Sequence, residues 1–419
     1  MQKDLFRQII IRNQEILEEI ALHPRDICFE EKGNYVLVGV RHAGKSYILY
    51  QHALKLLEQG VPLDRLVFIN FDDERLFEMK PEDFDLILQA YESLSDKRPI
   101  LFFDEIQNIE GWDHFARRLA NEKYRVYITG SNAKMLSRDV ATVLGGRFFT
   151  LMVYPYSFKE FISAKGLSLK QHWQYGRSQR GKVERLFKEY FEYGGFPEVL
   201  NYVDKRKWLN SLFERIFFSD MVVKNKVRNE EALRMTMKRL AENVKQPTSY
   251  NRIANIIKGT GTSVTVTSVS EYVQYMRDSC FIFSLENYRA KFVEKETVKK
   301  HYFVDNGLLN IFLLDAETSL LENICAIHLY RKYENDLYYF KMNEEVDFYI
   351  PSQGLGIQVA YSLRESSVIE REVKGLKLLH EKHPLNKMMI MTRDEKDEIV
   401  LDEERKIDVI PVWKWLLEE

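Results

Sequence analysis

Residues 39–46 form a glycine-rich segment that ends in a lysine and a serine. The segment reads Gly-Val-Arg-His-Ala-Gly-Lys-Ser, and it lies between an apolar run, Tyr35–Val38, and a helical stretch, Tyr47–Leu57. Glycines let the backbone turn so that successive N–H groups point at phosphate oxygens, and the positive end of the following helix adds to that attraction. The pattern predicts that Lys45 reaches the β- and γ-phosphates of ATP and that Ser46 binds Mg²⁺. A chance glycine-rich turn is the alternative. The residues expected to contact the nucleotide are Gly39, Val40, Arg41, His42, Ala43, Gly44, Lys45, Ser46 and Tyr47.

Two carboxylates follow the next strongly apolar run. Residues 99–105 read Pro-Ile-Leu-Phe-Phe-Asp-Glu. At the carboxyl end of a buried strand, Asp104 is expected to hold Mg²⁺ through its hydration shell. Glu105 faces the other way and is expected to act as the general base for the attacking water, an effect of about 10²–10⁴-fold in rate. The alternative is a solvated strand end without a catalytic role.

Small polar residues end a further strand. Val126–Gly130 runs directly into Ser131 and Asn132. In P-loop ATPases with a strand inserted beside the phosphate-binding strand, such a polar tip orients the water near the γ-phosphate. Asn132 or Ser131 is therefore a candidate for this role, with an ordinary loop start as the alternative.

An arginine after this strand is a candidate for contact with transition-state charge. Arg147 follows two glycines, and an arginine in such a role is worth about 10³–10⁵ in rate. The sequence leaves open whether Arg147 acts in its own chain, in a neighbouring copy, or only as a salt-bridge partner. Arg117 and Arg118 compete for the same role.

Short apolar strands alternate with helices around these motifs. This βαβ pattern predicts a parallel sheet covered on both faces, and hence an α/β fold of the P-loop NTPase type. A helix is expected before the sheet, over residues 3–22. The expected strands are Tyr35–Gly39, Leu66–Phe71, Ile100–Phe103 and Arg125–Gly130, with helices at Lys45–Gln59 and Trp112–Asn121.

The remainder of the chain has a different pattern. Residues 158–226 are expected to be mostly helical, with an interruption at 194–197. Residues 229–310 predict helices followed by a β-hairpin, with Ser249 and Thr267 as helix caps. Residues from 318 onward predict a second α/β unit. The predicted segments are an ATPase core with its N-terminal helix (1–155), a helical extension (156–228), a helix-and-hairpin module (229–310) and a small α/β domain (311–419).

Several of these motifs together resemble the prokaryotic AAA_14-type P-loop ATPases, an AAA+/STAND-like ASCE family. They are Gly39–Ser46, Phe68–Leu76, Phe103–Trp112, Thr129–Ser131 and Tyr193–Glu198. The tail resembles the DUF4143 domain through Leu321–Asn323, Tyr338–Phe340 and Glu345–Phe348. The resemblance implies an ASCE-type ATPase core, a winged helix, and a C-terminal fold similar to the PD-(D/E)xK nucleases.

Charge is distributed unevenly along the chain. The formal net charge is −2, yet residues 221–300 carry 15 Lys and Arg against 8 Asp and Glu, an excess of +7. Lys291, Lys295, Lys299 and Lys300 lie in the hairpin connection and could contact the phosphates of double-stranded DNA. The third helix of the module carries Glu271 and Asp278, which argues against base readout. Relay of the nucleotide state or docking of a protein partner is the equal alternative.

The tail carries only part of a nuclease motif. Metal-dependent cleavage in the PD-(D/E)xK fold requires one carboxylate, a second acid on the next strand and a Lys two residues later. Glu322 and Asp347 are present, but Gln358 and Ala360 stand where the acid and the Lys are needed. The tail is therefore predicted to be catalytically inactive. The spacing of His380 and His383 favours an exposed helix end over a metal site.

Composition excludes several classes of protein. With 45% apolar and 30% charged residues, the chain is globular and not collagen-like or broadly disordered. Its three cysteines are far apart, which excludes a disulfide framework, and no apolar run has the length of a membrane span. We expect a cytoplasmic ATPase that uses ATP and Mg²⁺. A nucleotide-gated switch or adaptor for a protein partner, with little turnover, is the alternative.

Overall fold

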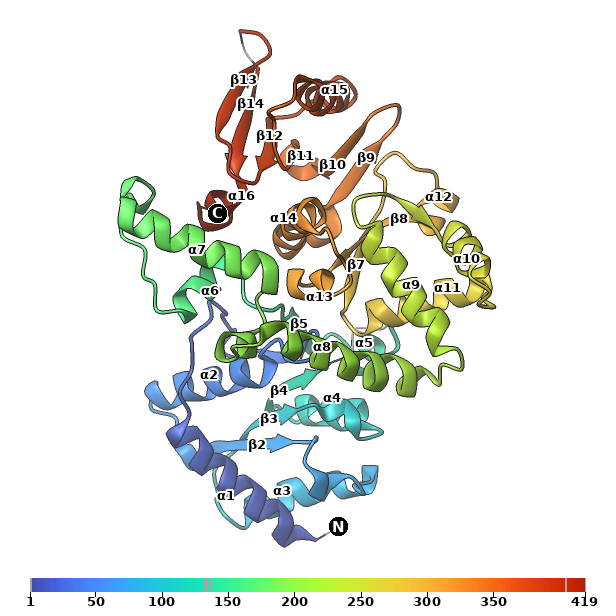
Figure 1. The fold of residues 1–419 in the computed structure, drawn as a ribbon. Coiled ribbons are helices and arrows are strands. Elements are labelled where there is room, and N and C mark those ends of the chain that lie inside the picture. Colours follow the sequence, from blue (N-terminus) through green and yellow to red (C-terminus); the bar gives the residue numbers. More distant parts are fainter. Residues whose placement is uncertain (1, 132–134, 136–137, 404, 419) are drawn as a thin grey trace. The chain divides into compact units, whose positions relative to one another are not determined.

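The computed structural model describes residues 2–131, 135, 138–403 and 405–418 of the 419. The described residues form two compact units, one within residues 1–154 and 278–280 and the other within residues 155–277 and 281–419. Figure 1 shows the helices and strands of both units, coloured along the chain. Across the described ranges, no helix has both the length and the apolar character that crossing a bilayer requires.

A parallel β-sheet forms the centre of the first unit. It consists of β1 (Asn34–Val38), β2 (Leu66–Asn70), β3 (Ile100–Asp104), β4 (Arg125–Gly130) and β5 (Phe148–Met152). The strand order is β2-β3-β4-β1-β5, so β4 lies between β3 and β1 and pairs with both in parallel. Side chains of β1 to β4 are buried along nearly their whole length, as expected when both faces of a parallel sheet are covered. The predicted α/β P-loop fold, with its inserted strand, is confirmed.

The helices of the first unit cover this sheet. They are α1 (Lys3–Glu19), α2 (Lys45–Glu58), α3 (Phe84–Glu92), α4 (Trp112–Asn121) and α5 (Arg138–Leu144). Helix α1 packs against β2 and α3, whereas α2 and α4 both pack against β4. These contacts place the helix that follows the glycine-rich segment directly against the inserted strand.

Two details of this unit differ from the sequence expectation. Helix α1 ends at Glu19, before the expected end at residue 22. Strand β5 was not predicted from the sequence. It lies at the edge of the sheet, where its side chains are only partly buried and Phe149 is exposed. Its residues are nearly all apolar, as in the central strands, so its edge position rather than its composition sets it apart.

The second unit begins with helices. They are α6 (Phe158–Ala164), α7 (Arg177–Tyr193), α8 (Lys205–Arg215) and a π-helical segment (Ile216–Val223). A capping box starts α6, because the Ser157 hydroxyl accepts from the N–H of Glu160 and the Glu160 carboxylate accepts from the N–H of Ser157. Helix α7 ends before Gly194, as the predicted interruption requires.

A helix-and-strand module follows within the same unit. It contains α9 (Glu230–Glu242), β6 (Thr248–Ser249), α10 (Tyr250–Gly259), α11 (Val266–Asp278), β7 (Ile282–Leu285), α12 (Phe292–Thr297) and β8 (Val298–Phe303). The strands form an antiparallel sheet in the order β6-β8-β7. Ser249 caps α10 as predicted. The expected Thr267 cap is wrong, because the Thr265 hydroxyl accepts from the N–H of Ser268 and the helix starts earlier.

The tail forms a mixed sheet with helices on it. Its elements are α13 (Asn306–Asn310), α14 (Glu317–Tyr333), β9 (Tyr338–Lys341), β10 (Glu345–Ile350), β11 (Leu355–Val359), α15 (Ser366–Lys382), β12 (Lys387–Thr392), β13 (Asp397–Val400), β14 (Lys406–Pro411) and α16 (Val412–Glu418). The strand order is β13-β14-β12-β11-β10-β9. Strands β11, β12 and β14 pair in parallel, and the other pairs are antiparallel. Strand β13, mostly exposed at the sheet edge, was not predicted.

A buried aspartate joins the end of α7 to the segment after β8. The Asp305 carboxylate accepts hydrogen bonds from the N–H groups of Gly195 (2.7 Å) and Gly307 (2.8 Å). Burial raises the pKa of Asp305 to about 6, against the opposing effect of these donors. Gly194 has φ +74, and a Cβ there would come within 1.9 Å of the same carboxylate. Only glycine therefore suits position 194.

Gly194→Ala is expected to lower the thermal midpoint of the second unit by about 5–10 °C, because it adds backbone strain and a steric overlap with Asp305. Gly166→Ala is the matched control, since Gly166 also has φ +74 but open space around its missing Cβ. The control carries the backbone strain alone and should cost clearly less. Calorimetry of both variants tests this, and equal losses would contradict the role given to Asp305.

Candidate functional site

The carboxyl ends of three neighbouring strands meet at one edge of the first sheet. Strand β1 leads into the glycine-rich segment, β3 ends at Asp104, and β4 ends at Gly130. The register is parallel, with Val38 beside Gly130 and Phe103 beside Ile128. The residues that follow these strands are therefore neighbours, although they lie far apart in sequence.

The backbone of the glycine-rich segment makes a tight loop into α2. Gly44 has φ +92 and forms the N-cap of α2, while His42 also has a positive φ. At Gly39, a Cβ would lie 2.0 Å from the carbonyl oxygen of Val153, so no larger residue fits. The loop thus presents backbone N–H groups and a helix N-terminus, the arrangement that binds phosphates.

Lys45 lies inside this loop. Its side chain is buried, with the residue only 4% exposed. The ammonium donates to the carbonyl oxygens of Gly39 (3.1 Å) and Val40 (3.2 Å) and lies 3.6 Å from the Glu105 carboxylate. Because neutral carbonyl groups provide most of its contacts, the ammonium can exchange them for phosphate oxygens.

Asp104 is buried beside the start of α2. Its carboxylate accepts hydrogen bonds from the hydroxyl groups of Thr129 (2.5 Å) and Ser46. Burial, with the neighbouring Glu105 charge next, raises the pKa of Asp104 to about 6. The structure thus brings Ser46 and Asp104 together, and their hydroxyl and carboxylate oxygens are ligands of the type that Mg²⁺ prefers.

Glu105 follows directly, with a left-handed backbone at φ +51. Its N–H donates to the Thr129 hydroxyl (2.9 Å), and its carboxylate accepts from the Gln107 side-chain amide (2.5 Å). Burial by itself raises the pKa of Glu105, but Lys45 together with Gln107, Arg41 and Ser131 brings it below the usual value. Glu105 is therefore ionised at neutral pH and can accept a proton.

Three residues of this site were missed by the sequence analysis. Thr129 bridges Asp104 and Glu105, and Gln107 orients Glu105. The Arg25 guanidinium donates to the carbonyl oxygen of Ala43, inside the loop. The small polar residues at the end of β4 were a usable signal for Thr129. No feature of the sequence around Arg25 indicates that its side chain contacts the glycine-rich loop.

The other predicted site residues have varied positions. Ser131 is buried near Glu105, and Asn132 lies outside the described residues. Tyr47 is exposed at the start of α2, beside Tyr50. Arg147 donates to Asn121 (2.5 Å) and to the carbonyl oxygen of Gly145 (2.9 Å).

The structure does not bring Arg147 to the site. Its carbonyl oxygen accepts from Asn34, the first residue of β1, so Arg147 lies at the amino edge of the sheet. Lys45 and Glu105 follow the opposite, carboxyl edge. The candidate Arg118 pairs with Asp85 from α3, and Arg117 on α4 is exposed.

The predicted basic contacts of the hairpin connection need correction. Lys299 is buried and pairs with Glu286 (3.0 Å), and Lys300 is fully buried among carboxylates. Neither side chain is available to DNA phosphates. Of the four lysines expected to contact DNA, Lys291 is exposed and Lys295 is half-buried.

In the tail, the structure brings Glu322 and Asp347 together around Lys300. Gln358 accepts a hydrogen bond from the N–H of Asp347 (3.0 Å). His380 accepts from the N–H of Leu385 (3.1 Å), and the ring of His383 packs on aromatic rings. Among the described residues, no group of His, Cys, Asp or Glu has an arrangement that could hold a metal ion.

Comparison with known families identifies an AAA domain over residues 31–162, the segment that contains Lys45, Asp104 and Glu105. A domain of unknown function, DUF8612, matches residues 184–319. The chain therefore carries a P-loop ATPase domain of the AAA type. The expected DUF4143 domain is not shown, and the different domain that is found covers the helices and the hairpin module instead of the tail.

Two relatives match nearly the whole chain. The uncharacterized protein MJ1544 of Methanocaldococcus jannaschii is 32% identical over 99% of this chain and 96% of its own length. An uncharacterized protein of Haemophilus influenzae is 31% identical over 91% of this chain and 94% of its own length. Among solved structures, the Walker-type ATPase PABY2304 of Pyrococcus abyssi has a TM-score of 0.42 at 12% identity, covering 74% of this chain and 95% of that one.

Metal-dependent ATP binding is expected to weaken as the pH falls through about 6, because protonated Asp104 no longer serves a cation. Titration of a fluorescent ATP analogue with Mn²⁺ should show constant affinity above this pH and a loss of up to about tenfold per unit below it. Thr129→Val removes a hydrogen bond that lowers the Asp104 pKa, so the loss should begin at higher pH, whereas Thr129→Ser should keep the native profile. A native profile in Asp104→Asn would contradict the assignment.

Proposed function

We propose that this chain, which belongs to one family with MJ1544 and the Haemophilus influenzae relative and carries an AAA domain, is a Mg²⁺-dependent ATPase. ATP and water would become ADP and phosphate. The observation that carries the proposal is the meeting of Lys45, Asp104 and Glu105 beside the glycine-rich loop. We further propose that the nucleotide state sets the position of the helices and the tail.

Each side chain of the site has a separate task in this reaction. Lys45 exchanges the carbonyl oxygens of Gly39 and Val40 for the β- and γ-phosphate oxygens. Glu105, ionised at neutral pH, accepts the proton of the water that attacks the γ-phosphorus. The bond between the γ-phosphorus and the bridging oxygen breaks, and ADP leaves with the negative charge. Gln107 orients the Glu105 carboxylate by a hydrogen bond, and Thr129 accepts a hydrogen bond from the Glu105 backbone N–H.

Ser46 and Asp104 are the residues proposed to hold Mg²⁺. The buried Asp104 carboxylate accepts a hydrogen bond from the Ser46 hydroxyl, so a cation would find both oxygen ligands side by side. When bound, Mg²⁺ supplies charge neutralisation at the β- and γ-phosphate oxygens. Arg147, at the amino edge, would reach such a site only in another copy of the chain.

Lys45→Ala and Glu105→Gln are expected to separate binding from hydrolysis. Lys45→Ala should weaken ATP binding by about 10- to 100-fold, because a charged contact to the phosphates is lost. Glu105→Gln should retain binding and lose about 10²–10⁴-fold in turnover. Equilibrium binding and phosphate release measure the two effects.

Matched controls for this pair lie on the same elements. Lys55→Ala removes an exposed lysine from the far end of α2, and Glu110→Gln neutralises an exposed carboxylate shortly after β3. Both controls should keep native binding and turnover. Native turnover in both Lys45→Ala and Glu105→Gln would rule out the proposed site.

The elements in residues 230–303 follow the order helix–strand–helix–helix–strand–helix–strand. Apart from the short helix α12 between the last two strands, this is the order of a winged helix, and we propose that module here. The tail, with Gln358 and Ala360 at key positions, is proposed to be a nuclease-like fold without activity. Of the expected DNA-contacting lysines, Lys299 and Lys300 are buried, whereas Phe292 and Val293 on α12 are 78% and 71% exposed. These observations favour a second candidate function, a nucleotide-gated switch for a protein partner, over a DNA-linked enzyme.

Turnover measured with and without duplex DNA over a salt series discriminates the two. We expect DNA to change turnover by less than about twofold, because two of the four lysines expected to contact its phosphates, Lys299 and Lys300, are buried. The same samples should show no Mg²⁺- or Mn²⁺-dependent cleavage of the DNA. Strong stimulation that falls with salt would support a DNA-linked enzyme, and cleavage lost in Asp347→Ala would overturn the inactive tail.

A further inference from the structure

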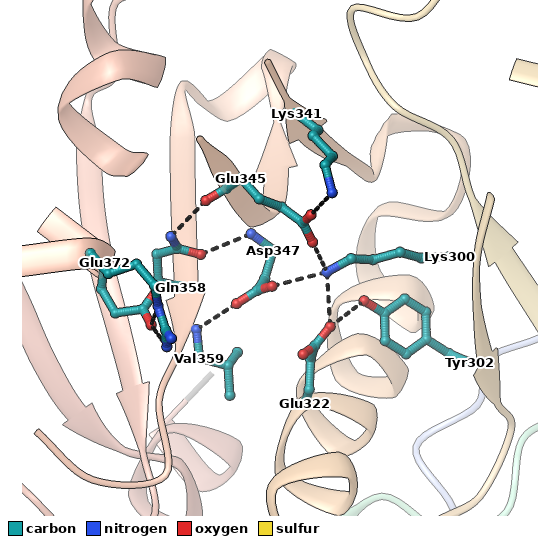
Figure 2. A network of polar contacts seen from close by, with 10 residues as sticks. Lys300, Tyr302, Glu322, Lys341, Glu345, Asp347, Gln358, Val359 and Glu372 are labelled. Atoms are coloured by element: carbon teal, nitrogen blue, oxygen red, sulfur yellow. Dashed lines mark hydrogen bonds and ion pairs between the residues drawn. The ribbon is translucent and has the colours of Figure 1, made fainter. Parts of the chain in front are cut away.

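A lysine from the hairpin module is buried in the acidic cluster of the tail. Lys300 lies on β8, and its residue exposure is 0%. Its ammonium lies 3.1 Å from Glu322 on α14 and 2.8 and 2.9 Å from Glu345 and Asp347 on β10. Figure 2 shows the three carboxylates converging on this one nitrogen from two elements.

The number of contacts matches the chemistry of the ammonium. A lysine ammonium has three N–H donors and no acceptor, and three carboxylates accept here. The second oxygens of two of these carboxylates are also used, since Glu345 pairs with Lys341 (2.7 Å) and Asp347 accepts from the N–H of Val359 (2.9 Å). Glu322 accepts in addition from the Tyr302 hydroxyl (2.7 Å). The three acids thus surround a cation that the chain itself supplies (Figure 2).

This network depends on the charge of Lys300. Burial, with the Asp347 charge next, raises the pKa of Glu322 to about 8 even though Lys300 opposes the shift. Three acids therefore share the single positive charge of Lys300, and burial favours the neutral form of one of them, Glu322. Without the ammonium, the largely buried Glu322 and Asp347 would lose their ion-pair partner, which is far more costly than losing a surface ion pair.

A cleft opens beside the cluster. It has a volume of about 690 Å³, and its lining includes Glu322, Glu345, Asp347, Gln358 and Glu372. Such a cleft could admit a hydrated cation to the carboxylates. In the described part of the chain, however, no group of three or more His, Cys, Asp or Glu residues is arranged to hold one, and these acids contact the ammonium instead.

Backbone contacts join the hairpin module to the tail near this cluster. The N–H of Tyr288 donates to the carbonyl of Tyr339 (2.9 Å), and the N–H of Tyr339 donates to the carbonyl of Glu286 (3.1 Å). Asn287 donates to the carbonyl of Lys341 (3.1 Å). The module that carries Lys300 is therefore bound along its connection to β9, next to the strand that bears Glu345 and Asp347.

We propose that Lys300 is an internal cation that takes the place of a metal ion in the tail: its ammonium holds Glu322, Glu345 and Asp347 together, locks β8 against α14 and β10, and keeps divalent cations out of the cleft. The ion pairs of Lys300 then hold the tail and the hairpin module together. This role is independent of ATP hydrolysis at the other site.

Thermal unfolding of the nucleotide-free full chain tests the proposal. Lys300→Met, which is close in length but uncharged, should lower the midpoint by about 10 °C. Lys341→Met is the matched control, because it removes a more exposed lysine from the same Glu345 and should cost less than about 2 °C. Millimolar Mn²⁺ should leave the midpoint of the native chain unchanged and raise that of Lys300→Met. The rise should vanish when Asp347→Asn is added.

A compensated variant covers the case in which Lys300→Met does not fold. Combining Lys300→Met with Glu322→Gln and Asp347→Asn removes the unpaired charges and should restore a soluble, cooperatively unfolding chain. Three outcomes would overturn the proposal: equal losses in Lys300→Met and Lys341→Met, no effect of Mn²⁺ on a folded Lys300→Met, or an insoluble compensated variant. Stabilisation of the native chain by Mn²⁺ that is lost in Asp347→Asn would also overturn it.

Discussion

The candidate ATPase site depends on the parallel pairing of β4 with both β1 and β3. Parallel strands end at the same edge, so this pairing places the glycine-rich loop, Asp104 and the polar tip after β4 side by side. From the inserted strand, the Thr129 hydroxyl donates to the Asp104 carboxylate and accepts from the backbone N–H of Glu105. A sheet without the inserted strand would leave Asp104 and Glu105 without this support.

Two buried lysines show how the surroundings of a cation decide its use. Lys45 contacts two neutral carbonyl groups and lies near one carboxylate, so its charge remains available to phosphate oxygens. Lys300 is enclosed by three carboxylates, and each of its donors is satisfied within the chain. Equally buried ammonium groups can therefore serve exchangeable binding in one unit and permanent cohesion in the other.

Much of the fold could be predicted because the central elements carry strong local signals. The strand over residues 125–130 and the helix over 112–121 were predicted with their observed bounds, since a continuous apolar run and an amphipathic stretch marked them. Strand β13 was missed because it is short, mostly exposed and carries two acids, whereas β5 was missed although its residues are nearly all apolar. The predicted helix cap, Thr267, lies two residues after the observed cap, Thr265, because closely spaced hydroxyl residues offer equivalent caps.

The sequence by itself was enough to predict the chemistry proposed for the first site, because Gly39–Ser46, Asp104 and Glu105 are each marked by residue type and by their place after an apolar run. Tertiary structure alone decided which charges are available. It placed Arg147 at the opposite edge of the sheet, set Thr129 between the two acids, and turned Lys300 from an expected DNA contact into a buried counter-ion. The physical reason is that motif chemistry is local, whereas burial and pairing of a charge depend on residues that only the folded chain brings together.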